Sequence, residues 1–288
     1  MELTKSKIGG ILGIIMILII SALFCGCTGE EKKDDNGNGS EGDNERSISI
    51  SGSTTVQPIA VAAAEDWMNA HSKDIITVSA GGSSVGIKDV AAGTSDIGMA
   101  SRELKQSEKD ENPDLVQHIV AKDGIGIIVH KNNPITGLTL EQVKKMYLGE
   151  ITNWNEIGGP DKEIVIVGRD SASGTRATFD ELVLDDQDPS ENMQQKQSNG
   201  QVHETIKTNE NAIGYVGLGY VDVEVKGVPI DGVEPTVTNV QLGNYPISRN
   251  LNMFTKGAAT GLAKDFIDYL LSTEGQQIVS DEGFVPIA

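Results

Sequence analysis

Three times along this chain, an apolar run that predicts a β-strand is followed directly by a short loop rich in glycine, serine and threonine, and then by a helical pattern. Strands that alternate with helices indicate an α/β fold with largely parallel sheets. Ligands of such folds collect at the carboxyl ends of the strands. We therefore expect these loops to lie where a ligand could bind; they are residues 52–55 (GSTT), 81–84 (GGSS) and 171–175 (SASGT).

The period of the apolar residues places the other elements. Pro58 suits the first turn of a helix, and Thr139 with Gln142 predicts a capping box. Asp123 and Gly124 separate two of the expected strands. Strands are expected at residues 47–51, 75–80, 95–101, 116–121, 125–131, 163–168 and 250–257, with a buried strand and turn within 211–221. Helices are expected at residues 56–70, 85–93, 139–149, 176–184, 262–272 and 273–281.

The three loops have the chemistry of an anion site. Each would place hydroxyl groups and free backbone N–H groups at the positive end of a helix dipole. For one loop alone, ordinary N-capping by serine or threonine is the simpler explanation. Two arginines favour the anion: Arg102 follows Ser101 at the end of a strand, and Arg169 stands four residues before Ser173. A planar guanidinium suits a tetrahedral oxyanion.

The N-terminal segment is typical of export. Lys5 and Lys7 precede an apolar run over residues 8–24, which is short for a membrane span. The following residues resemble a lipoprotein processing site, with Gly26 before a lipid-modified Cys27. Phe24 is bulkier than that pattern usually shows, so an uncleaved anchor remains the alternative. Residues 28–46 are polar and acidic and predict a flexible tether, so the body would lie outside the cell membrane.

Charge and cysteine content exclude several classes of function. The formal net charge is −19; residues 1–27 hold Glu2, Lys5 and Lys7, a net +1, so the remainder carries −20. Such a surface repels nucleic acid. Cys25 and Cys27 are the two cysteines, so the folded body has no disulfide and no cysteine nucleophile. No cluster of histidine, cysteine and aspartate has metal-ligand spacing, and we expect neither a metal nor a cofactor.

An ordered set of motifs resembles the phosphate-binding proteins of bacterial and archaeal phosphate importers. The set is GSTTVQP, GGSSVGIKDV, DIGMASREL, KDGIGIIVHKNNP, GRDSASGTR, NAIGYVGLGYV, YPISRNLNMFTKG and the ending GFVP. The resemblance implies a type II periplasmic-binding-protein fold: two α/β lobes, two crossovers and a cleft that closes on the anion. Lobe 1 would comprise residues 47–124 and 248–288, and lobe 2 residues 125–247. The implied function is extracytoplasmic phosphate binding and delivery to the permease of an ABC importer, and we expect a monomer without enzymatic activity.

The resemblance also implies the ligand residues. The two loops of the first lobe and the strand that follows them would supply Ser53, Thr54, Thr55, Ser83 and Ser101, and the RxxxSGT pattern would supply Arg169, Ser173, Gly174 and Thr175. Some family members carry an aspartate directly after the serine of the third strand, which accepts the proton of phosphate. Arg102 occupies that position here, so we include Arg102 among the ligand residues and expect Asp123 to serve as the acceptor. A turn-forming Asp-Gly pair is the alternative for Asp123.

Two other functions fit parts of the sequence. The ligand could be another oxyanion, such as sulfate or molybdate. Residues 82–86 (GSSVG) match the G-x-S-x-G elbow of serine hydrolases with Ser84 at the serine position. A hydrolase also needs a histidine and an acid within reach. His71, His118, His130 and His203 are the only histidines, and none lies in a loop that pairs with an acid, so the hydrolase is the weaker interpretation.

Overall fold

One mixed β-sheet runs through the part of the chain that the structure, a computed structural model, describes: residues 45–287. The strands pair in the order β2-β1-β3-β9-β4-β7-β5-β6, and β8 pairs with β4. The strands are β1 (Arg46–Gly52), β2 (Asp74–Ala80), β3 (Ile97–Ala100), β4 (Leu115–His130), β5 (Val165–Arg169), β6 (Gln194–Lys196), β7 (Ala212–Gly217), β8 (Val225–Gly227) and β9 (Ser248–Lys256).

The helices confirm the alternation that the sequence predicted. The capping box of Thr139 and Gln142 forms at the start of α4, and Pro58 lies in the first turn of α1. Residues 106–111, 199–208 and 237–241 form helices that the periodicity did not predict. The α-helices are α1 (Gln57–Ala70), α2 (Ser83–Ala92), α3 (Gln106–Glu111), α4 (Leu140–Leu148), α5 (Gly174–Val183), α6 (Asn199–Thr208), α7 (Val237–Gln241), α8 (Gly261–Leu270) and α9 (Thr273–Asp281), with 3-10 turns η1 (Trp154–Ile157) and η2 (Leu218–Tyr220).

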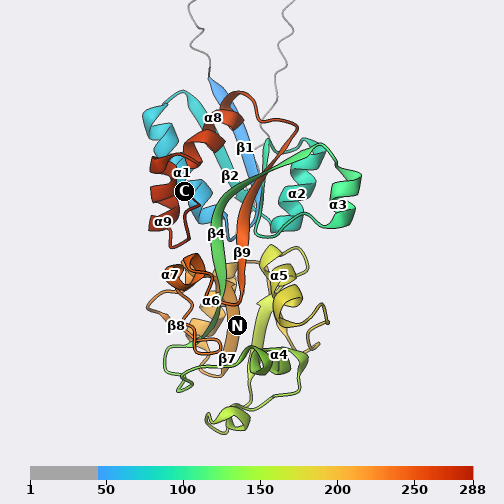
Figure 1. Cartoon of the computed structure of the whole chain (residues 1–288), viewed down its shortest axis with the longest axis vertical. Helices are drawn as coiled ribbons and strands as arrows, with labels where there is room; N and C mark the ends of the chain where they lie inside the picture. Colours follow the sequence, from blue (N-terminus) through green and yellow to red (C-terminus); the bar gives the residue numbers. More distant parts are fainter. Residues whose placement is uncertain (1–44, 288) are drawn as a thin grey trace, which may run out of the picture. The chain divides into compact units, whose positions relative to one another are not determined.

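Two long antiparallel strands, β4 and β9, run side by side through the centre of the sheet (Figure 1). Their pairing continues through Asp123, opposite Arg249, and Gly124, opposite Ser248. The prediction of two strands broken at this point is therefore wrong, because these two residues keep their ladder pairs and form no turn. The expectation of largely parallel sheets holds for β1 with β2 and β3, and for β5 with β6 and β7, but not for the antiparallel pairs of β4 and β9.

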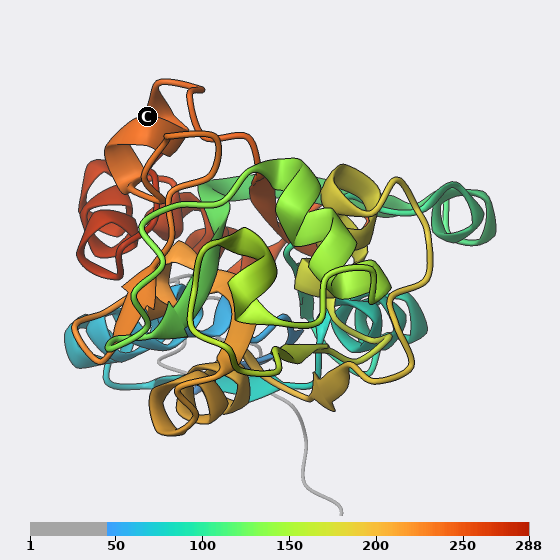
Figure 2. The same ribbon diagram turned by 90° about the horizontal axis from the view of Figure 1, so that it is seen from below.

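The apolar side chains gather in two main clusters, which are the cores of two lobes. The first lobe is built on β1, β2 and β3 with α1, α8 and α9, and its core includes Ile50, Met99 and Phe266. The second is built on β5 and β7 with α4 and α5, and its core includes Trp154 and Tyr215. Seen from below, the yellow-green segment of α4 and η1 in the second lobe lies nearest the viewer (Figure 2). The strands β4 and β9 connect the two lobes.

The predicted export features lie outside the described residues. These are the signal segment 1–27 with Cys25 and Cys27, and residues 28–44 of the tether; β1 already begins at Arg46. Among residues 45–287, no helix combines the length and the apolar character needed to cross a membrane.

An ion pair fastens the start of β1 to β2. The Arg46 guanidinium donates to both carboxylate oxygens of Asp74, at 2.8 and 2.7 Å, and the Trp67 indole N–H donates to the same carboxylate at 2.9 Å. The hydrogen bonds from Arg46 hold the pKa of Asp74 below its ordinary value, although burial acts in the opposite direction. Asp74 is buried, whereas Arg46 is partly exposed.

We predict that Asp74→Asn lowers the free energy of unfolding by about 1–3 kcal/mol at neutral pH, since hydrogen bonds to a charged group are lost. A lowered folded-state pKa stabilises the fold above the unfolded-state pKa, and this contribution disappears as the pH falls through the folded-state value. The difference from wild type should therefore shrink in acid, as measured by urea unfolding at several pH values. Asp265→Asn removes an exposed partner of the same Arg46 and should cost less than about 1 kcal/mol. A pH-independent loss for Asp74→Asn would contradict this account.

Candidate functional site

The hydroxyls of the first predicted loop are buried at the junction of the two lobes. Ser53, Thr54 and Thr55 follow β1 and are each less than 5% exposed. The Ser53 hydroxyl accepts hydrogen bonds from the N–H groups of Thr55 and Val56, at 3.2 and 3.4 Å. The Thr55 hydroxyl lies 3.0 Å from the hydroxyl of Thr175 in the second lobe. The loop therefore keeps polar atoms where water is excluded.

The second loop meets the third strand beneath the start of α5. The Ser83 hydroxyl accepts the N–H of Ser101 at 3.0 Å and lies 3.4 Å from the Ser101 hydroxyl. The Ser84 hydroxyl, at the serine position of the G-x-S-x-G motif, accepts a hydrogen bond from Arg102 at 3.2 Å. Gly174 packs against Ser83 and Ser101: a Cβ added there would lie 2.9 Å from the Ser83 Cβ and 2.7 Å from the Ser101 hydroxyl oxygen. Only glycine permits this approach, so α5 begins directly on the first lobe.

The RxxxSGT segment gives Ser173 and Thr175 different roles. The Ser173 hydroxyl accepts the N–H of Arg176 at 3.2 Å and is an ordinary N-cap of α5. The Thr175 hydroxyl instead bonds Thr55 across the lobes. Arg169, at the end of β5, is 1% exposed. Its side chain donates to the backbone carbonyls of Lys196 and Gln197, at 3.2 and 3.0 Å.

Asp123 is fully buried and faces an arginine that the sequence interpretation did not single out. Arg249 of β9 donates to Asp123 Oδ2 from Nε and Nη2, at 3.0 and 2.7 Å, and the Leu218 N–H donates to Oδ1 at 2.9 Å. Burial raises the pKa of Asp123, although Arg249 favours the charged form. Burial lowers the pKa of Arg249, although Asp123 opposes this. The position of Arg249 within the motif YPISRNLNMFTKG was the signal that could have identified it.

Two buried nitrogens at this junction have no hydrogen-bond partner: Arg169 Nη1 and Arg249 Nη1. They are the only such side-chain nitrogen or oxygen atoms found in the described part of the chain. Burial lowers the pKa of Arg169 to about 10, which reflects a charge with little compensation. Leaving a buried charged donor unpaired is costly, and such exceptions call for an explanation such as an absent ion. The two guanidinium groups thus mark a place suited to an anion.

The Arg102 guanidinium is paired within the first lobe and does not lie with those of Arg169 and Arg249, although the sequence placed Arg102 among the ligand residues. Its guanidinium makes two hydrogen bonds to the carboxylate of Glu108, at 2.7 and 2.8 Å, and one to the Ser84 hydroxyl at 3.2 Å. A bidentate carboxylate from α3 fixes the side chain in this direction. The sequence did not predict α3, so the partner could not be foreseen.

Asn199 of α6 is a second residue that the sequence did not reveal. It is fully buried, and its amide nitrogen donates to the hydroxyls of Thr54 and Thr55, at 3.1 and 2.9 Å. The Tyr220 hydroxyl of η2 donates to the Thr54 carbonyl at 2.7 Å. Both contacts join the second lobe to the first loop. No sequence motif pointed to Asn199, because α6 itself was not predicted.

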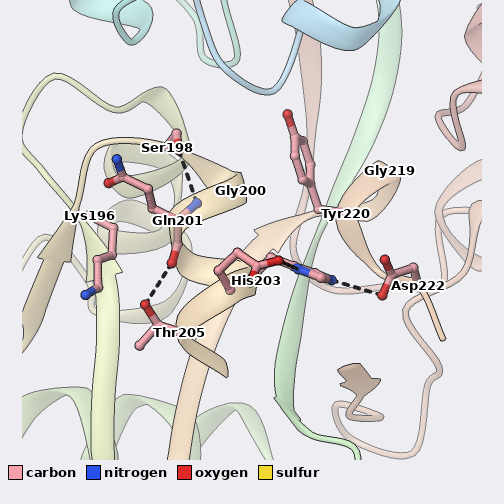
Figure 3. Close-up of a pocket in the computed structure, with 10 residues that line it drawn as sticks. Lys196, Ser198, Gly200, Gln201, His203, Thr205, Gly219, Tyr220 and Asp222 are labelled. Carbon is pink, nitrogen blue, oxygen red and sulfur yellow. Dashed lines mark hydrogen bonds and ion pairs between the residues drawn. The ribbon is translucent and has the colours of Figure 1, made fainter. Parts of the chain in front are cut away.

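A separate surface pocket of about 580 Å³ lies along α6 and η2 (Figure 3). Its His203 contacts Asp222 at 2.9 Å. His203, Asp222 and Glu224 form the one group of potential metal ligands found among residues 45–287, with ligand atoms within 4.8 Å of one another. The Lys207 ammonium lies 2.8 Å from Glu224 and already supplies a positive charge to that carboxylate.

We predict that Gly174→Ala keeps the two lobes apart, since the added methyl group would overlap Ser83 and Ser101. Small-angle scattering should give a larger radius of gyration than for wild type. Gly200→Ala is the matched control, because a Cβ there has only the Ser198 hydroxyl near it, at 3.9 Å. Equal radii for Gly174→Ala, Gly200→Ala and wild type would contradict the packing described here.

Comparison with known proteins places this geometry in a family. Residues 38–274 match the family model described as the PBP superfamily domain. The chain is 38% identical over 283 residues to the phosphate-binding protein PstS of Bacillus subtilis (strain 168), covering 95% of this chain and 94% of the relative. It is 34% identical to the PstS of Borreliella burgdorferi, covering 85% and 91%.

A solved structure is similar throughout its length. It is a phosphate ABC transporter substrate-binding protein from Clostridium perfringens with bound phosphate, which is 43% identical with a TM-score of 0.81, over 84% of this chain and 100% of that one. An ABC-type phosphate transport receptor from Vibrio cholerae is 32% identical with a TM-score of 0.70, over 83% and 99%. The two-lobed periplasmic-binding fold expected from the sequence is thereby confirmed, and the chain belongs to the PstS family of phosphate-binding proteins within the PBP superfamily.

Proposed function

We propose that this protein binds inorganic phosphate outside the cytoplasm and delivers it to an ABC-type importer. The observation that carries the proposal is the pair of unpartnered, buried nitrogens, Arg169 Nη1 and Arg249 Nη1. A dianion between the two guanidinium groups would give both nitrogens an acceptor and would offset two buried positive charges, of which Asp123 compensates one. The names of the similar proteins, which state phosphate binding, support the same ligand.

The donors for the anion come from both lobes in this proposal. Ser53, Thr54, Ser83 and Ser101 serve from the first lobe, and Thr55 serves through the hydroxyl of Thr175, which lies 3.0 Å from its own. Arg169, Gly174 and Thr175 serve from the second, where the start of α5 adds backbone N–H groups and the positive end of a helix dipole. Ser173 caps the same helix, and Arg249, held by Asp123, is added to the residues expected from the sequence.

We also propose that the two lobes move against each other and that the protein docks on a membrane permease. Residues 47–124 and 248–288 would move against residues 125–247, with β4 and β9 as the crossovers that bend when the lobes close. The closed monomer would dock on the membrane permease of the importer. The lipid on Cys27, with the tether expected at residues 28–46, would keep the protein at the outer face of the membrane.

Titration calorimetry with phosphate, sulfate and molybdate tests the proposed function. We expect phosphate to bind one-to-one and the binding to survive treatment with a chelator. Arg169→Ala should weaken it by more than the roughly tenfold cost of one neutral hydrogen bond, because the anion's charge loses compensation. Arg102→Ala is the comparison, since that guanidinium is occupied by Glu108, and it should change the affinity by much less. Unchanged affinity in Arg169→Ala would remove this arginine from the site.

Another oxyanion, such as sulfate, is the competing ligand. Asp123 is the residue that would discriminate between phosphate and sulfate. It is the only carboxylate with no exposed surface in the described part of the chain. It can accept the proton that phosphate carries near neutral pH, whereas sulfate has no proton to offer and meets it as charge against charge. Sites that depend on one buried hydrogen bond discriminate by about 10⁴.

We predict that the intact protein rejects sulfate and that Asp123→Asn loses much of this rejection, because an amide can donate to sulfate. The variant also weakens the ion pair with Arg249, which would affect the binding of both anions. The readout is therefore the ratio of the phosphate and sulfate dissociation constants. Asp123 would not be the acceptor if that ratio were the same in the variant and in the intact protein.

A further inference from the structure

Asn199 of the second lobe donates to two hydroxyl groups of the first lobe. Its amide nitrogen has two N–H bonds, directed to Thr54 Oγ1 and Thr55 Oγ1. Its amide oxygen accepts the backbone N–H of Gly217 at 3.3 Å. Turning the amide over would bring its NH₂ group against that N–H, donor against donor, and would leave both hydroxyl groups facing an oxygen. The orientation of the amide is therefore fixed.

The Thr55 hydroxyl has a single arrangement compatible with its neighbours. Asn199 donates to its oxygen at 2.9 Å, and Arg249 Nη2 lies 3.4 Å from the same atom. Neither nitrogen can accept a hydrogen bond, so both lone pairs of the hydroxyl are engaged. The Thr55 proton must then be donated, and the oxygen within reach is Thr175 Oγ1, at 3.0 Å.

The direction of the Thr55 proton also determines the role of the Thr175 hydroxyl. Because its oxygen accepts from Thr55, its own proton is free to be donated elsewhere. Thr175 lies in the first turn of α5, beside Gly174 and among the groups assigned to the anion. The sequence of hydrogen bonds thus runs from Asn199 to Thr55, from Thr55 to Thr175, and from Thr175 to the ligand.

We propose that Asn199 is a positioning residue that orients the protons of Thr55 and Thr175, so that the Thr175 proton is directed at a ligand oxygen that carries no proton. The inference rests on the proposed function and deepens it. A ligand with one proton can place it on Asp123, whereas a second proton directed at Thr175 would displace the hydrogen bond that the Thr175 hydroxyl donates to the ligand. The site therefore favours monohydrogen phosphate over dihydrogen phosphate.

Removing Asn199 should release this constraint. Thr55 would keep only the long contact with Arg249 and could accept from Thr175, and Thr175 could then accept a proton from the ligand. We expect Asn199→Leu to weaken phosphate binding roughly tenfold where monohydrogen phosphate prevails, about the contribution of one oriented hydrogen bond. The loss should be at most a few-fold where dihydrogen phosphate prevails.

The measurement is the phosphate dissociation constant of the full chain by calorimetry, across the second ionisation of phosphate. The charged and titratable groups at this junction are Arg249, which contacts the Thr55 hydroxyl, Asp123, which pairs with Arg249, Tyr220, which donates to the Thr54 carbonyl, and Arg169. All are present in the variant and in wild type, so their common titration cancels in the ratio of the two constants. Asn199→Ala provides a second, smaller side chain should the leucine variant be unstable.

Asn252→Ala is the matched control: this asparagine is also fully buried, and it donates to the carbonyl of Arg102 at 3.1 Å. It should lower the melting temperature without changing the pH dependence of binding. Equal losses at every pH in the Asn199 variants would overturn the inference and leave the proposed function standing. A wild-type protein that fails to bind phosphate would instead contradict the proposed function itself.

Discussion

Two arginine side chains are buried where the lobes meet, and each keeps one nitrogen without a partner. A guanidinium in a water-free place is costly unless a counter-charge is present. Asp123 supplies one negative charge through Arg249, and Arg169 has only backbone carbonyls as hydrogen-bond acceptors. The surrounding hydroxyls and the start of α5 add further donors. The junction is thus built around an excess of positive charge and donors, which an anion would balance.

The sheet topology explains how this junction is assembled from distant parts of the sequence. The strands β4 and β9 pass from one lobe to the other, and their pairing places Asp123 opposite Arg249. Each lobe then brings its own loops to the same place: β1 and β3 end near the start of α2, and β5 leads into α5. Gly174 allows α5 to touch Ser83 and Ser101 directly.

The sequence predicted the alternation of strands and helices and the three hydroxyl-rich loops, because these depend on local pattern. It failed at Asp123 and Gly124, where a turn-like pair lies within a continuous strand, since pairing with β9 overrides local preference. The pairing of Arg102 with Glu108 was not foreseen, because Glu108 lies on a helix without an apolar face to reveal it. Arg249 and Asn199 were missed because their importance depends on partners 126 and about 145 positions away.

The central claim is that an anion completes the two arginines, and a crystal structure of the protein grown with phosphate tests it most directly. The account predicts one phosphate between the lobes, with its oxygens within hydrogen-bond distance of Arg169 Nη1 and Arg249 Nη1 and of the Thr175 hydroxyl. Phosphate bound elsewhere, or a closed structure in which both nitrogens still lack an acceptor, would contradict it.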